Sequence, residues 1–212
     1  MLVTLAGWTW SRAPILPSGN APANLDGGIG AVLGNTAVLP ALPAQELDPL
    51  EISVAADRYL TLGDRAFRDE RFADAVYYYT RATELEPGTG VLYLVLSDAL
   101  FATGDFAYAA YAVRRAIDLD PMLVSGGVDK RSFYADAQAF DRQLAVLELY
   151  LKEHPADGDA RLVLAVNQLF GGAPAAAVDT LEDPLAGDVL TDPGVRRVLE
   201  VARELQFGEP AK

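Results

Sequence analysis

Two stretches of the chain share one pattern of side chains, and this pattern decides the fold. Residues 59–87 read YLTLGDRAFRDERFADAVYYYTRATELEP, and residues 93–121 read YLVLSDALFATGDFAYAAYAVRRAIDLDP. Apolar and small residues recur at the same places, and each stretch ends in a proline. Pro87, Pro121 and Pro155 are 34 residues apart. The chain therefore contains an internal repeat.

Small side chains mark the same period. Ala75, Ala109 and Ala177 occupy one place in successive units, while Gln143 stands at the step between the last two. Two helices can cross closely only where a methyl group is the largest side chain between them. A 34-residue period with two helical segments in each unit therefore predicts helix pairs stacked side by side.

The first unit carries a well-defined motif, and the second repeats most of it. The first-unit positions are Tyr59-x-x-Leu62-Gly63-x-x-Ala66, Ala75-x-x-x-Tyr79, Ala82 and Pro87. On these residues the chain resembles the tetratricopeptide repeat (TPR) family. The resemblance implies an all-α fold, a right-handed superhelical array of helix-turn-helix repeats with a C-terminal capping helix. The units are expected at residues 56–89, 90–123, 124–157 and 158–182, with the cap at 192–207.

The third unit departs from the pattern, and in this it is similar to a group of bacterial-type TPR proteins. Ser125-Gly126-Gly127 stands where its first helix should begin. We expect a short first helix over 130–137, followed by a regular helix over 141–153. The capping helix is predicted from Asp192-Pro193, because Asp caps helix starts and Pro favours the first helical position.

Composition excludes several classes of function. The 212 residues include 30 acidic and 17 basic side chains, a net charge of −13, which argues against a nucleic-acid partner. Cys is absent and His154 is the only histidine, so thiol nucleophiles, paired imidazoles and zinc sites of the usual kind are missing. His154 stands beside Pro155 at a helix end, and we expect a capping or solvated role for it rather than catalysis. We predict no catalytic, cofactor-binding or metal-binding residue, and no enzyme.

Residues 1–50 differ in composition from the rest. They are rich in Pro and Gly, which interrupt helices and strands, so we expect a mostly irregular leader before a helical domain at 51–212. We expect the leader to be dispensable for folding; whether its apolar residues dock on the repeats stays open. The sequence shows neither a membrane span nor a signal peptide, and the compartment, cytoplasmic or exported, stays open as well.

The resemblance places function on the concave face, which the first helix of each unit lines. The partner-binding residues it implies are Leu60, Asp64, Phe67, Arg68, Leu94, Asp98, Phe101, Leu162, Val166 and Leu169. The alternative is that Phe101, Leu169 and Phe170 are buried between helices. We expect a non-enzymatic scaffold that binds a peptide or protein segment of unknown identity. The alternative function is a structural protein that self-associates into an oligomer.

Overall fold

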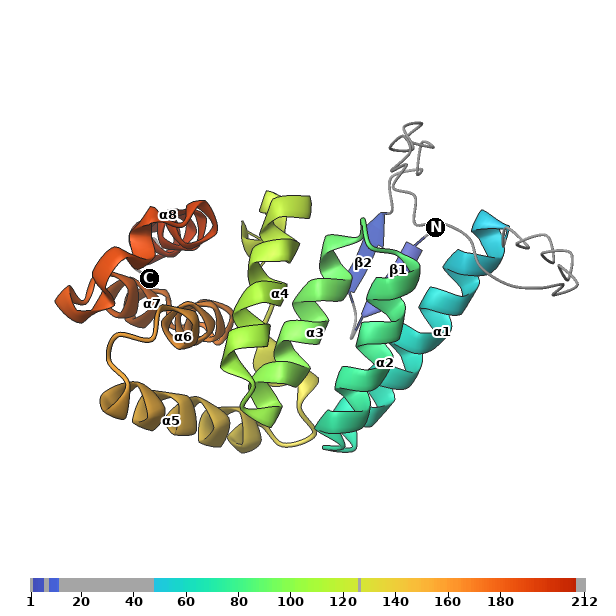
Figure 1. Cartoon of the computed structure of the whole chain (residues 1–212), viewed down its shortest axis with the longest axis horizontal. Coiled ribbons are helices and arrows are strands. Elements are labelled where there is room, and N and C mark those ends of the chain that lie inside the picture. The colour runs from blue at the N-terminus through green and yellow to red at the C-terminus, as the bar shows by residue number, and fades with distance from the viewer. Residues whose placement is uncertain (1, 6–7, 12–47, 126, 209–212) are drawn as a thin grey trace, which may run out of the picture. The chain divides into compact units, whose positions relative to one another are not determined.

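A computed structural model of the chain describes residues 2–5, 8–11, 48–125 and 127–208 (Figure 1). The chain divides into two compact units, Met1–Asp48 and Pro49–Lys212. In the first unit, β1 (Leu2–Leu5) pairs antiparallel with β2 (Trp8–Ser11). This hairpin was not expected in an irregular leader, and it forms where β-favouring Val, Thr and Trp residues gather. The irregular run expected over 12–47 lies outside the described residues.

Two regular helix pairs open the second unit. The first pair is α1 (Pro49–Arg68) with α2 (Phe72–Leu85), and the second is α3 (Gly90–Thr103) with α4 (Phe106–Leu119). Each of these helices packs against the next along the chain, as Figure 1 shows. The helix-turn-helix units expected from the repeat are therefore present in this part of the chain.

The repeat positions hold the pairs together. Ala75 and Ala109 are completely buried, as the close crossing of helices requires. Gly63 has a similar role, because a Cβ atom there would lie 2.4 Å from the Tyr79 ring. The Tyr79 side chain is buried between the first two helices as a result.

The turns within the two pairs have the same backbone hydrogen bonds but different residues. In the second pair, Gly104 has φ of 83°, and Asp105 caps α4 by accepting a hydrogen bond from the Tyr108 backbone N–H at 3.1 Å. In the first pair, Glu70 takes the left-handed conformation, with φ of 57°. The left-handed region disfavours residues that have a Cβ, so the first turn is the strained one.

The third unit does not form a helix pair. Its first half consists of two short 3₁₀ helices, η1 (Pro121–Ser125) and η2 (Lys130–Phe133), in place of the expected helix over 130–137. Its second half is α5 (Ala137–Glu153), which begins four residues before the predicted start because Asp136 caps it. Figure 1 shows α5 running crosswise to α3 and α4.

The array continues past this segment. Helix α6 (Gly158–Phe170) packs directly against α4 and pairs with α7 (Pro174–Glu182). After the 3₁₀ segment η3 (Pro184–Thr191), helix α8 (Pro193–Gly208) covers α7 as the predicted cap, and Asp192 accepts a hydrogen bond from the Gly194 backbone N–H at 2.8 Å. From Pro49 onward the described chain is therefore an all-α helical repeat array. None of its described helices is both long and apolar enough to cross a membrane.

Candidate functional site

Most side chains of the predicted concave face are buried in the folded chain. Of the ten, Asp64 is partly exposed and Arg68 is exposed. The buried ones are Leu60, Phe67, Leu94, Asp98, Phe101, Leu162, Val166 and Leu169. Phe101, Leu169 and Phe170 are all buried, which agrees with the alternative interpretation that they are buried residues.

A segment of the third unit lies against this face. We call residues 130–140 the crossing segment, because they contact the inner helices α1, α3 and α6. Tyr134 packs edge-on against Phe67 of α1, with ring centroids 4.9 Å apart. Phe140 packs against Phe101 of α3 at 6.3 Å. The chain itself therefore occupies part of the surface that the sequence assigned to a partner.

Lys130 of the crossing segment is buried although it is charged, with 1% of its surface exposed. Its ammonium group forms an ion pair with Asp98 of α3 and lies 3.4 Å from Asn167 Oδ1 of α6. It also lies 5.0 Å from the centre of the Phe170 ring. Burial raises the pKa of Asp98, and the Lys130 ammonium opposes that shift. A buried lysine needs partners of this kind, and here three groups supply them.

Asp64 stands at the place in the first unit that Asp98 occupies in the second. It accepts a hydrogen bond from the Tyr79 hydroxyl at 2.9 Å. Burial raises the pKa of Asp64 to about 6, while the Tyr79 hydrogen bond and the Arg68 guanidinium oppose the shift. The two aspartates of the inner face are thus held by different partners.

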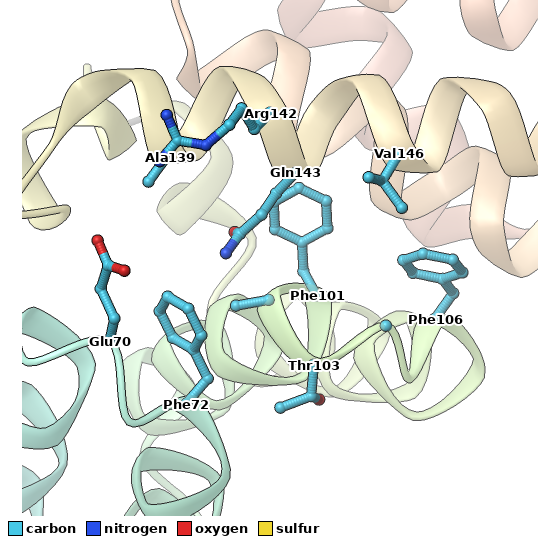
Figure 2. Close-up of a pocket in the computed structure, with 11 residues that line it drawn as sticks. Glu70, Phe72, Phe101, Thr103, Phe106, Ala139, Arg142, Gln143 and Val146 are labelled. Atoms are coloured by element: carbon cyan, nitrogen blue, oxygen red, sulfur yellow. The ribbon is translucent and has the colours of Figure 1, made fainter.

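An open pocket of about 340 Å³ lies beside the crossing segment (Figure 2). The turns of the first two helix pairs form one wall, and α5 forms the other. The lining residues are Glu70, Phe72, Phe101, Ala102, Thr103, Gly104, Phe106, Ala139, Arg142, Gln143 and Val146. Three phenylalanines lie on the side of the turns, and Figure 2 shows Val146 facing Phe106 across the gap. Such a pocket suits an apolar side chain.

Of the lining residues of this pocket, the sequence predicted only Phe101 as a partner-binding residue. Gln143 was a sequence signal for the remaining lining residues of the pocket, because it replaces the small residue of the repeat. A helix with Gln at this position cannot approach a partner helix as closely as α2 and α4 approach theirs. In the structure Gln143 lines the pocket and accepts a hydrogen bond from the Tyr134 hydroxyl at 2.7 Å.

His154 is the C-cap of α5, as predicted. Its Nδ1 atom lies 3.0 Å from the Tyr150 carbonyl oxygen, and its ring stacks on the Tyr150 ring with centroids 4.2 Å apart. The side chain therefore has a role at the helix end.

Comparisons with known proteins find matches among the solved structures. No family model matches the chain, and no curated protein matches it. Among solved structures, the chain is similar to the TPR2B domain of yeast Sti1, described in its complex with pHsp70, at 18% identity and a TM-score of 0.37. The match covers 74% of this chain and all of that one. The description of this chain as a TPR-like helical repeat rests on its 34-residue period and on the helix pairs described above.

Proposed function

We propose that the chain is a non-enzymatic protein-interaction scaffold that binds a peptide or protein segment through the pocket between α5 and the turns of the first two pairs. The observation that supports this function is an apolar pocket that stays open beside a buried inner face. Phe72 and Phe106 are only partly buried, and Val146 is 62% exposed. Apolar groups left uncovered in a concave site are typical of ligand-binding surfaces.

The chemistry of the rim defines the partner more closely. Glu70 stands on the wall of the turns, and Arg142 and Gln143 stand on the wall of α5. An aromatic or large aliphatic side chain fits the phenylalanines, while the backbone on either side of it can form hydrogen bonds with these polar groups. The partner is therefore a segment with one apolar anchor residue.

Selection from a display library of random linear peptides tests this function. The full chain is the bait, and Val146→Glu is the variant that places a charge at the pocket. Leu149→Glu is the matched control, because Leu149 lies on the same helix, is 58% exposed and does not line the pocket. We expect the wild-type chain and the control to enrich the same peptides, which share an aromatic or aliphatic anchor, and Val146→Glu to lose them.

Two outcomes would contradict the proposal. One is the absence of enriched peptides, and the other is equal binding of those peptides to the Val146→Glu variant. If no peptide binds and light scattering shows a concentration-dependent oligomer, self-association is the better description of the function.

A further inference from the structure

The crossing segment contacts the inner face in the way that a bound peptide would. It touches the inner helix of the first pair through Phe67, that of the second pair through Asp98 and Phe101, and α6 through Asn167 and Phe170. The contacts of Lys130 and Tyr134 are made by the four-residue η2 and its C-cap, while Phe140 makes its contact from the first turn of α5. Segments with so little regular structure are the parts of a protein that open most easily.

The helical array is joined without this segment. Helix α4 packs directly on α6. Arg114 of α4 donates a hydrogen bond to Asp159 of α6 at 2.7 Å and forms an ion pair with Asp192 before α8. The crossing segment is therefore not the connection that holds α4 and α6 side by side.

The binding place of Lys130 is organised for an alkylammonium group. A primary ammonium has three N–H donors, and the site offers a carboxylate, an amide oxygen and an aromatic face. The Asn167 side chain is held in position, because its Nδ2 atom donates to the Val163 carbonyl oxygen at 2.8 Å and its Oδ1 atom is left to face Lys130. Asp98, Asn167 and Phe170 belong to α3 and α6, so they stay together when residues 130–140 leave.

A second place on the face receives an aromatic ring. Tyr134 lies against Phe67 at 4.9 Å and against Phe72 at 6.2 Å. Both phenylalanines belong to the first helix pair. The face thus has one place for an ammonium group and another for the aromatic side chain four residues later.

We propose that residues 130–140 are an intramolecular ligand of the inner face, and that a segment of a partner protein carrying a lysine and, four residues later, an aromatic side chain binds there in their place. This inference goes beyond the pocket function and does not depend on it. A tethered ligand has a high effective concentration, so it competes with a partner and weakens the partner's apparent affinity.

A labelled synthetic peptide with the sequence of residues 128–140 is the probe, and fluorescence anisotropy with the full chain is the measurement. Lys130→Ala in the protein empties the ammonium site. We expect this variant to bind the peptide about 10-fold more tightly than the wild-type chain, or better. A peptide with Met in place of its lysine should bind the variant at least about 10-fold more weakly. Adding Asp98→Asn to the variant should have the same effect.

Tyr134→Ala is the second variant, because it loosens the crossing segment and leaves the Lys130–Asp98 pair intact. Circular dichroism checks that each variant is folded. Tighter peptide binding by either folded variant, together with its loss for the Met peptide, supports the proposal. Binding no tighter than that of the wild-type chain overturns it, as does equal binding of the Met peptide. If neither variant folds, residues 130–140 are part of the core and the proposal is wrong.

Discussion

The two regular pairs, α1–α4, and the segment with η1, η2 and α5 are built in opposite ways. In the pairs, helices are held by residues at repeat positions, such as Ala75, Ala109 and Tyr79. In the third unit, a buried lysine and two aromatic rings hold the chain against helices that precede and follow it. A sequence period therefore specifies packing only where both helices of a unit form.

The largest effect should come from removing a buried aromatic ring between paired helices. Tyr79→Ala should lower the free energy of unfolding by ~3–5 kcal/mol, because it leaves a cavity. Tyr134→Ala in the crossing segment should lower it by less, since the loss cannot exceed the cost of opening that segment. Urea denaturation measures both values. Equal losses would show that the two regions are equally part of the core.

Overpacking the repeat positions should have the next largest effect. Ala75→Leu and Ala109→Leu should each cost ~1–3 kcal/mol, because both alanines are completely buried at helix crossings. Ala107→Leu is the control on α4, since Ala107 is exposed, and it should change stability by less than ~0.5 kcal/mol. Melting temperatures equal to that of the wild-type chain for both buried variants would contradict the account of helix pairing.

Asp64 of the first unit should make the stability of the protein depend on pH. The pKa of Asp64 is about 6 in the folded chain, above the value of about 3.9 expected when it is unfolded. The contribution of protonated Asp64 to the free energy of unfolding is therefore fully present below about pH 4, and it is lost as the pH rises through about 6. Asp64→Asn should stabilise the protein by ~1–3 kcal/mol at pH 7 and have little effect at pH 4. Chemical denaturation at both pH values measures this, and a gain that is the same at both would be inconsistent with the raised pKa.

The smallest effect concerns the turns of the two pairs. Glu70→Gly should stabilise the chain by ~1 kcal/mol, because glycine adopts the left-handed conformation without steric cost. Gly104→Ala should destabilise it by a similar amount, since φ is 83° there. Thermal unfolding of the two variants checks the opposite signs. Two shifts of the same sign would argue against strain at Glu70.

The sequence predicted the regular pairs well, because their determinants are local. The unit expected over 90–123 contains the helices Gly90–Thr103 and Phe106–Leu119. A glycine and a capping aspartate mark the turn between them, and small residues mark the crossing. Each of these signals can be seen within one repeat.

The third unit and the pocket could not be predicted in the same way. Lys130 has the appearance of an ordinary surface lysine in the sequence, and its burial depends on Asp98 and Asn167, which lie 32 and 37 residues away. Asp98 was placed on the inner face, but nothing in the repeat indicated its partner. Gln143 is the local sign that the third unit departs from the repeat. It indicates that a close helix crossing is absent, but it does not indicate what replaces the crossing.

The order of the ammonium-site residues along the chain also sets the order in which the site assembles during synthesis. Both helices of each regular pair are adjacent in the sequence, so α1–α4 can fold as soon as they leave the ribosome. Asp98 is made first, Lys130 follows, and Asn167 and Phe170 come last. Until α6 has been synthesised, the ammonium site lacks two of its three partners. Lys130 can therefore gain all three partners only late in translation, and until then its contact with the inner face rests on Asp98 alone.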